Sequence, residues 1–184
     1  MPVYLKDLPV KPELDFIADD DAFARFQLVP DIAALNWPAD VVRQWIWDHG
    51  TNDHFLRDYA ALDLSLLNWT LEKVPTDDFM TLVTGVSDGD AIEEYAANHH
   101  YWMELKNKAK GTVRSAWEDN GTWVVPPVAI ACCLMELSGA GLHLIEGRTR
   151  VGVLRGRQRA GLNVAPKHLV WVGRKRGSEQ ERSF

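Results

Sequence analysis

The sequence predicts an α/β fold, an α+β arrangement with a small mixed sheet and a large helical insertion. Apolar residues recur at helical spacing through the middle of the chain, between residues 39 and 119. After the turn signal at Asn120 and Gly121, short runs rich in β-branched residues surround one basic segment of helical spacing. Strands interleaved with helices are typical of this class.

Length and composition indicate one globular domain without a membrane anchor. The chain has 184 residues, of which 46% are hydrophobic and 25% charged. Its apolar runs are shorter than the roughly 18–20 residues of a membrane helix, and its N-terminus lacks a signal-peptide pattern. The only cysteines, Cys132 and Cys133, are adjacent, which disfavours a disulfide framework. We therefore expect a cytoplasmic protein.

The first half of the chain is expected to hold an arm, one strand and several helices. Residues 1–21 read as an arm or loop, and residues 23–29 as a short strand ending at Pro30. One helix is expected from Pro38 to Gly50, and a second from about Asn52 until Pro75 stops it. Further helices are expected over residues 76–83, from about residue 90 to Gly111, and over residues 112–119.

The second half predicts three short strands and one helix. Strands are expected over residues 128–134, 142–145 and 168–172, and the first two form a hairpin across the turn at residues 138–141. A helix is expected over residues 149–159. The single domain, residues 1–184, thus divides into a helical elaboration (39–110), an α/β part (111–172) and a loose tail (173–184).

The segment around Gly147 is the most informative part of the sequence. The apolar run 142–145 is followed by Glu146, by Gly147 and then by a helix that opens with Arg148, Thr149 and Arg150. A strand that turns at a glycine into a helix leaves backbone N–H groups unpaired, and with the helix dipole these favour an anion. Arginine and threonine side chains supply further donors. The segment predicts a phosphate or carboxylate site.

The order of these features resembles the ParB/sulfiredoxin-like fold family, whose members carry a Gly-x-x-Arg loop between a strand and a helix. Gly147 and Arg150 match the glycine and the arginine, Glu146 precedes them, and Arg148 and Thr149 fill the two variable positions. The resemblance is best over residues 112–172. Residues 26–30 resemble the family's first strand.

The resemblance implies a nucleotide or other phosphate at the loop, with Mg²⁺ as a possible companion. Family members include CTP-hydrolysing DNA-partition proteins, an ADP-dependent serine kinase and an ATP-using sulfinic-acid reductase. In such a role Glu146 is the candidate catalytic residue for phosphoryl transfer or nucleotide hydrolysis, and residues 147–150 bind the ligand. Arg148 stands where the reductase has its cysteine, and the kinase's two histidines are absent, so no particular reaction is implied.

Other interpretations of the same residues stay open. Gly147 could be a tight turn only, with Arg150 paired to a structural carboxylate such as Glu136. A catalytically silent regulator, or an immunity or antitoxin-like factor, would instead bind a protein partner through its acidic, tryptophan-rich helices. Trp47 falls off the apolar side of its predicted helix and is the candidate anchor.

The charge distribution suggests a third, less favoured role, nucleic-acid binding or cleavage. Residues 147–176 contain nine Lys and Arg and no acid, whereas the whole chain carries a net charge of -6, so the rest carries -6 minus 9, or -15. Arg155 and Arg159 lie one helical turn apart and could follow a phosphate backbone. The alternative is that these arginines pair with the acidic remainder inside the fold. No motif predicts a metal site.

Overall fold

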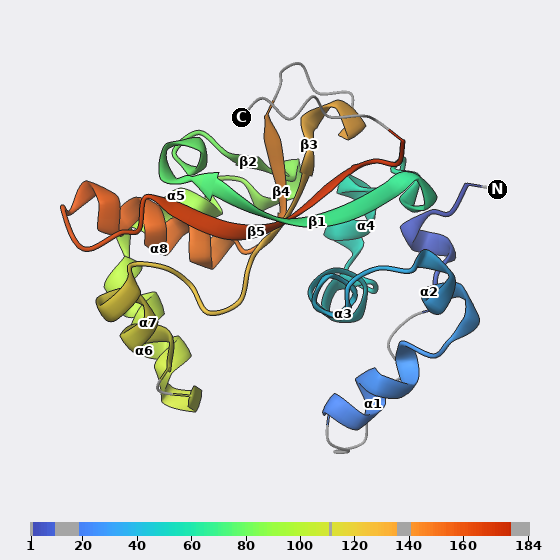
Figure 1. Cartoon of the computed structure of the whole chain (residues 1–184), viewed down its shortest axis with the longest axis horizontal. Coiled ribbons are helices and arrows are strands. Elements are labelled where there is room, and N and C mark those ends of the chain that lie inside the picture. The colour runs from blue at the N-terminus through green and yellow to red at the C-terminus, as the bar shows by residue number, and fades with distance from the viewer. Residues whose placement is uncertain (1, 10–18, 111, 136–140, 178–184) are drawn as a thin grey trace.

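The computed structural model is built around one mixed sheet (Figure 1). It describes residues 2–9, 19–110, 112–135 and 141–177. The strands among them are β1 (Leu67–Pro75), β2 (Val83–Thr84), β3 (Val128–Ala131), β4 (Leu142–Glu146) and β5 (Lys167–Lys175). They lie in the order β1-β5-β3-β4-β2, with β1–β5 and β3–β4 antiparallel and β5–β3 and β4–β2 parallel. The predicted α/β class with a small mixed sheet is confirmed.

The helices fall into two groups, one on each side of the sheet in Figure 1. Those before β1 are α1 (Asp19–Phe26), α2 (Pro30–Leu35), α3 (Ala39–Val41), which continues as a π-helical turn (Val42–Trp47), and α4 (Asp53–Asp58). Those after β2 are α5 (Ala91–Ala97), α6 (His99–Lys110), α7 (Thr112–Asn120) and α8 (Arg148–Arg159). Short 3₁₀ turns occupy Leu5–Asp7, Leu64–Leu66, Thr76–Phe79, Val86–Asp88 and Cys132–Met135.

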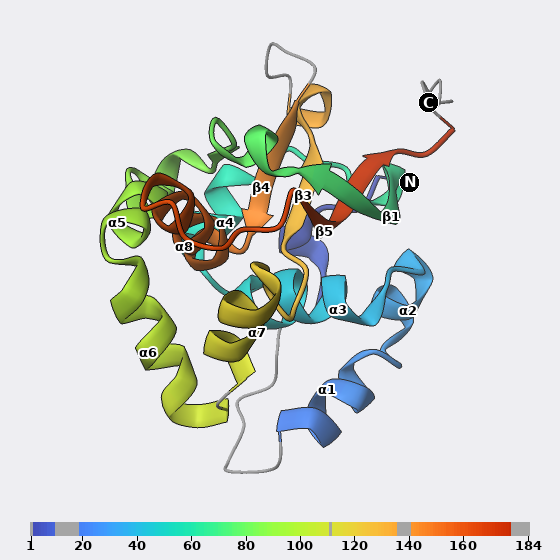
Figure 2. The ribbon, with the colours of Figure 1, turned by 60° about the vertical axis from the view of Figure 1, so that its left-hand side comes forward.

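Alternating side chains of the strands divide the buried residues into two cores. Val128 and Ile130 of β3 join the N-terminal helices in one core, whereas Ala129 between them joins α5, α7 and α8 in the other. Ile145 and Leu144 of β4 separate in the same way. Because successive side chains of a strand point to opposite faces, the sheet is covered on both sides, as the rotated view in Figure 2 also shows.

The strand predicted over residues 23–29 is wrong, because this segment begins with the second half of helix α1. Phe23 and Phe26 are three residues apart, a helical spacing, and both pack edge-on against Trp47 at 5.5 and 5.1 Å between ring centroids. Pro30 does not end a strand but opens α2 as its first residue. The segment compared with the first strand of the ParB/sulfiredoxin-like family is therefore helical or turn.

The helix predicted from Asn52 to Pro75 is also wrong beyond Asp58. Helix α4 ends there, and Leu67–Pro75 forms strand β1, which pairs along its whole length with β5. Leu67 and Trp69 are buried while Asn68 and Thr70 are exposed, an alternation of period two. Consequently residues 39–110 are not wholly helical, since they supply two strands of the sheet.

Trp47 is buried rather than exposed, with 1% of its surface accessible. A regular helix would turn it away from Val42 and Trp45, but the chain forms a π-helical turn over Val42–Trp47. Its wider turn changes the direction of the side chains that follow, and Trp47 joins Trp45 in the core. The predicted exposed anchor for a protein partner at Trp47 is therefore contradicted.

The helix predicted over residues 76–83 is wrong, because only a 3₁₀ turn forms at Thr76–Phe79 and Val83 begins strand β2. The strand predicted over residues 128–134 ends at Ala131, where a 3₁₀ turn follows. The other predictions of secondary structure differ less. The long helix expected up to Gly111 is divided at Asn98 into α5 and α6, and α7 and α8 lie where they were expected. The hairpin of β3 and β4 is confirmed, although the turn predicted at residues 138–141 lies mostly outside the described residues. The tail predicted to be loose begins inside β5, which continues to Lys175.

Close packing of α8 against α5 depends on two glycines of α8. A Cβ at Gly152 would lie 2.3 Å from the Cβ of Tyr95, and one at Gly156 would lie 2.3 Å from the carbonyl oxygen of Ala96. Only glycine permits such an approach. In the described part of the chain, no helix has the length and apolar character needed to cross a membrane.

His168 gives this fold a specific pH dependence. It is 1% exposed on β5, its Nδ1 lies 2.8 Å from Thr122 Oγ1 and its Nε2 lies 3.1 Å from Thr76 Oγ1. Burial lowers the pKa of His168 from 6.5 to about 4. As the pH decreases, His168 is protonated in the unfolded chain at a higher pH than in the folded chain. The free energy of unfolding should therefore fall by up to about 3 kcal/mol as the pH decreases from 6.5 to 4.

Urea denaturation between about pH 7.5 and 4.5 measures this dependence. His168→Gln should flatten the slope of stability against pH in this window, whatever its stability at neutral pH. The matched change at the exposed His100, His100→Gln, should leave the slope as it is. An unchanged slope in His168→Gln would assign the acid sensitivity to other groups.

Candidate functional site

Gly147 makes the turn from β4 into α8 that the sequence predicts. Its φ of 117° is one that residues with a side chain rarely adopt, and a Cβ there would lie 2.5 Å from Pro127 Cβ. The amide of Val151 donates to its carbonyl at 2.9 Å, which begins the helix. The amides of the preceding first turn have no intrahelical acceptor, and no acidic residue stands in that turn.

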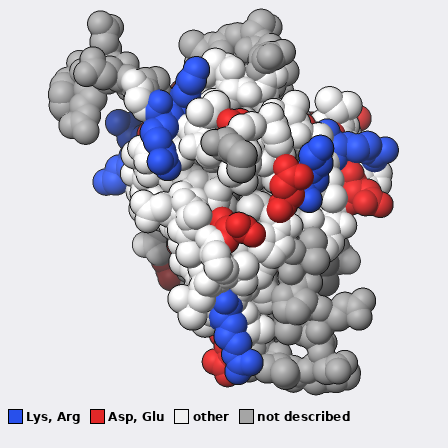
Figure 3. Space-filling view, turned by 90° about the vertical axis from the view of Figure 1, so that its right-hand side faces the viewer, with Lys and Arg blue, Asp and Glu red and all other residues white. Residues whose placement is uncertain are grey.

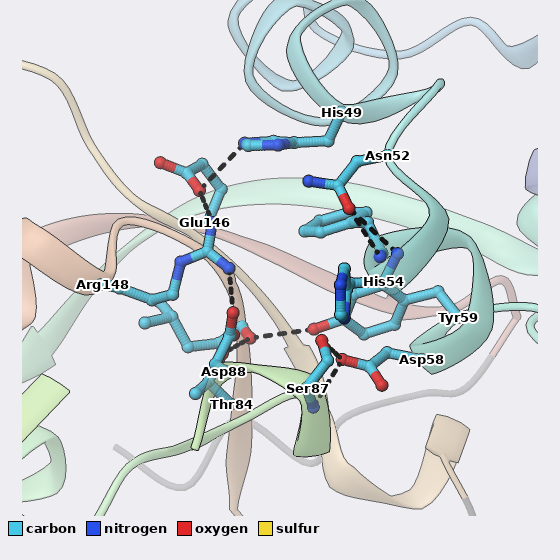
Figure 4. A network of polar contacts seen from close by, with 12 residues as sticks. His49, Asn52, His54, Asp58, Tyr59, Thr84, Ser87, Asp88, Glu146 and Arg148 are labelled. Carbon is cyan, nitrogen blue, oxygen red and sulfur yellow. Dashed lines mark hydrogen bonds and ion pairs between the residues drawn. The ribbon is translucent and has the colours of Figure 1, made fainter. Parts of the chain in front are cut away.

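Glu146 is the most heavily partnered residue of this loop (Figure 4). Its carboxylate lies 3.2 Å from His49 Nε2, 3.1 Å from an amino group of Arg148 and 3.4 Å from one of Arg150. Burial disfavours the charged form, but the hydrogen bond from His49 and the charges of Arg150 and Arg148 outweigh burial and hold the pKa of Glu146 below 4.5. The carboxylate is therefore ionised and neutralised within the fold.

Arg148 points away from the first turn of α8 and into a polar network. Its guanidinium contacts Asp88 as well as Glu146. Asp88 accepts a hydrogen bond from Thr84 Oγ1 at 2.6 Å, and that hydroxyl lies 3.1 Å from the Leu144 carbonyl. Although burial opposes it, the charges of Glu146 and Asp88 raise the pKa of Arg148.

The same network continues to helix α4 (Figure 4). Tyr59 Oη lies 3.2 Å from His143 Nε2 and 3.3 Å from the Leu144 carbonyl oxygen. Asp58 accepts from the backbone amide of Ser87 at 3.2 Å and also from its hydroxyl. Burial, with the negative charges of Asp88 and Asp58, raises the pKa of Tyr59, so this phenol stays protonated. These contacts connect the loop from Glu146 to Arg150 with α4 and with the turn at Val86–Asp88.

Arg150 has mainly structural partners. It donates to the carbonyl oxygens of Val125 at 3.0 Å and Pro126 at 3.4 Å, and it pairs with Glu146. Burial lowers its pKa despite the nearby carboxylate. A structural carboxylate is thus its partner, but that partner is Glu146, while Glu136 lies outside the described residues.

A hollow of about 300 Å³ opens beside the first turn of α8. Its polar side contains Thr149, Arg150, Glu146 and the backbone of Gly147. Its other walls are largely aromatic and aliphatic, and they come from α6, α7 and the segment before β3. The lining residues of these walls include Trp102, Met103, Trp117, Trp123, Val124, Val125 and Val153, with Gln44 and Asp48 from the N-terminal helix.

The arginines further along α8 are held inside the fold. Arg155 is 6% exposed and donates to the carbonyls of Phe79 and Leu82 at 2.8 and 2.7 Å. Arg155 and Arg159 share the carboxylate of Glu93 at 2.7 and 2.6 Å, and these hydrogen bonds lower the pKa of Glu93 to about 2. Both arginines therefore pair with an acidic residue inside the fold, which was the alternative to nucleic-acid contact. Arg155 presents almost no surface to a phosphate backbone.

Charges on the face drawn in Figure 3 are mixed. Basic side chains gather at its upper left, whereas acidic and basic side chains lie side by side at its right. Broad uncharged areas separate these groups, so the described residues of this face form no basic surface that extends across it. No group of three or more His, Cys, Asp or Glu side chains within the described ranges is arranged to hold a metal ion.

Sequence reasoning missed several members of this site. His49, Asp88 and Gln44 come from segments without a recognisable motif, 58 to 102 residues before Glu146 in the sequence. His49 has the spacing of an apolar stripe, and it stacks on Phe55 at 4.7 Å between ring centroids while its Nε2 contacts Glu146. An imidazole can pack against an apolar ring and still form a polar contact through one nitrogen. The apolar spacing of His49 in the sequence therefore gave no sign of its contact with Glu146.

No protein-family model, curated protein or solved structure matches the chain. The resemblance to the ParB/sulfiredoxin-like family therefore stays a prediction from the motif.

The charge network around Glu146 predicts a strong effect of its neutralisation. Glu146→Gln would leave Arg148 and Arg150 without their shared counter-charge, and we expect the free energy of unfolding to fall by about 3 kcal/mol. Glu94→Gln removes an acid that is exposed on α5 and should change stability by less than about 0.5 kcal/mol. Denaturant unfolding of both variants measures the difference, and equal stabilities would show that the network contributes little.

Proposed function

We propose that the chain binds a small organic phosphate of the nucleotide class in the hollow beside α8. The proposal rests on two features that occur together in this hollow. One is a helix start that favours an anion, and the other is a set of walls that favour a flat aromatic ring. Ligand pockets commonly measure about 300–1,000 Å³, and this hollow lies at the lower limit, a size suited to one small ligand.

The anionic part of the ligand would lie at the first turn of α8. Helix α8 has 12 residues, and Gly147 brings no side chain that would cap its unpaired amides. The hydroxyl of Thr149, in the same turn, can donate to a phosphate oxygen. An anion here would also interact favourably with the helix dipole.

The ring of the ligand would pack against the indoles. Trp102, Trp117 and Trp123 line the hollow. Aromatic rings stack on nucleobases without needing a particular base, at about 1–3 kcal/mol for each stacked base. Three indoles near a phosphate-binding turn favour a nucleotide over inorganic phosphate.

The two arginines of the motif contribute less positive charge than the sequence predicts. Arg148 and Arg150 are already paired with Glu146 and Asp88. Mg²⁺ carried on the ligand's phosphates would supply additional charge, and the binding tests therefore include it.

Positioning of the loop, rather than catalysis, is the role proposed for Glu146. Despite burial, a hydrogen bond from His49 and the charges of Arg150 and Arg148 hold the pKa of its carboxylate low. A carboxylate with a depressed pKa is a weak general base, since little driving force remains for proton transfer. In this proposal Glu146 positions the loop, and the ligand contacts its neighbours.

The two cysteines suggest the compartment. Cys132 and Cys133 are both free thiols. Free thiols are typical of reducing compartments, so we propose the cytoplasm, where nucleotides are abundant.

Thr149→Glu tests this proposal without disturbing the charge network. A negative charge in the first turn should preserve or slightly raise helix stability, but it should repel a phosphate. We expect ADP, ATP, CTP or GTP, with or without Mg²⁺, to raise the Tm of the unmodified chain, because a ligand at 100 times its Kd stabilises by about 2.7 kcal/mol. Thr149→Glu should lose at least about 90% of the affinity.

The control for net charge is Thr81→Glu, at an exposed threonine that does not line the hollow beside α8. It should bind nucleotide as the unmodified chain does. If no nucleotide shifts the Tm of the unmodified chain, or if both variants bind equally, the proposed site is wrong.

A further inference from the structure

Strand β1 (Leu67–Pro75) is one edge of the sheet (Figure 1). It pairs with β5 along its whole length and stands last in the strand order, next to β5 alone. Most of its residues after Trp69 are exposed. A long edge strand presents a row of peptide groups to which another strand can pair.

Hydrogen bonds at the two ends of β1 establish which of its residues point to β5. The carbonyl of Leu66, just before the strand, accepts from the amide of Arg176 at 2.6 Å. The amide of Thr76, just after the strand, donates to the carbonyl of Pro166 at 3.0 Å. The register between the two strands is continuous, and residues of an antiparallel pair point alternately to the partner and away from it. The even-numbered residues of β1 therefore bond to β5, and the peptide groups of the odd-numbered residues face the open side.

Three residues of β1 offer both an N–H and a C=O on this open side, namely Trp69, Leu71 and Lys73. No described residue forms a hydrogen bond with these groups. The odd-numbered residues at the ends of the strand cannot extend the row of donors. The amide of Leu67 already donates to the Leu64 carbonyl, and Pro75 has no N–H.

The open groups are symmetric about Leu71. If two copies of β1 pair antiparallel with a two-fold axis at Leu71, then Leu71 faces itself and Trp69 faces the second copy's Lys73. Each open donor meets an open acceptor. Shifting the register by two residues would set Trp69 opposite Pro75, or Lys73 opposite Leu67, and so leave a carbonyl unpaired. An unrelated strand would need no such symmetry, so this spacing favours a second copy as the partner.

The side chains agree with this register. Leu71 is 44% exposed, and two copies of it would cover each other at the axis. Glu72 would face the second copy's Thr70, and in each copy Thr70 already donates to Glu72 at 2.7 Å. Like charges therefore do not stand opposite each other. One of the shifted registers would instead set Glu72 against Glu72, which is unfavourable.

We propose that two copies of this chain associate through β1, in an antiparallel pairing with its two-fold axis at Leu71. The two sheets then join into one continuous sheet. The hollow beside α8 has no residue of β1 in its lining, so this inference is independent of the proposed nucleotide site.

Opposite charges at position 71 test the axis. Leu71→Lys and Leu71→Glu, each studied alone, set like charges against each other and remove both leucines from the interface. Each should raise the dissociation constant of the dimer at least about tenfold. An equal mixture of the two variants should associate about tenfold more tightly than either variant alone, because opposite charges then meet at the axis. Sedimentation equilibrium from micromolar to millimolar concentration measures these constants.

The matched controls are Leu28→Lys and Leu28→Glu. Leu28 is 78% exposed and lies between α1 and α2, away from β1 in the sequence. These variants, alone or mixed, should keep the dissociation constant of the unmodified chain.

Hydrogen exchange of single amides tests the same pairing in the unmodified chain, so its result does not depend on how a variant folds. In a monomer the amides of Trp69, Leu71 and Lys73 face solvent, whereas those of Thr70 and Glu72 are bonded to β5. Raising the protein concentration should slow exchange of the first three at least about tenfold, and far more than that of the other two.

The possible results decide between the partners. A chain that remains monomeric at millimolar concentration would overturn the proposal and leave the edge to a strand of another protein. A dimer that ignores both charges at Leu71, or that leaves the three outward amides unprotected, would have its interface elsewhere and would equally overturn it. Association that is lost in each charged variant and regained in their mixture supports the two-fold axis at Leu71.

Discussion

The arrangement of this protein depends on one buried charge, the carboxylate of Glu146. Burying it is costly unless hydrogen bonds and opposite charges compensate. His49 Nε2 and the guanidinium groups of Arg148 and Arg150 lie 3.1 to 3.4 Å from it. His49 follows the N-terminal π-helical turn, whereas the two arginines open α8. Compensating one charge therefore fixes β4, α8 and the N-terminal helices relative to one another, and these elements belong to cores on opposite faces of the sheet.

This compensation changes what the motif can offer to a ligand. Arg148 is directed to Asp88 and Arg150 to the Val125 and Pro126 carbonyls, so neither guanidinium is a mobile clamp. What remains open to the hollow is the first turn of α8 with Thr149, and beyond it the indoles. The paired arginines and Glu146 hold these groups in fixed positions. Such preorganisation lowers the entropic cost of binding a ligand.

Several arginines of the basic stretch, residues 147–176, also bind partners inside the fold. Arg155 holds the Phe79 and Leu82 carbonyls, and Arg157 lies over the Trp117 ring and donates to its carbonyl. Arg174 makes a two-bond contact with Glu72 on the neighbouring strand. Four acids, Glu72, Asp88, Glu93 and Glu146, thus pair with arginines of this stretch. Most of the arginines of α8 are therefore used inside the fold.

Local signals in the sequence determined the α/β class, the hairpin of β3 and β4, and the turn at Gly147, because glycine, proline and short-range periodicity act within a few residues. The sequence also indicated the residues of the loop from Glu146 to Arg150. Only the tertiary structure decided that Leu67–Pro75 is a strand, since its partner β5 lies about a hundred residues away. It likewise turned Trp47 inward and brought His49, Asp88 and Gln44 to the loop. Residues far apart in the sequence neutralise the buried charge and cover the sheet. No local sequence pattern predicts that these residues come together.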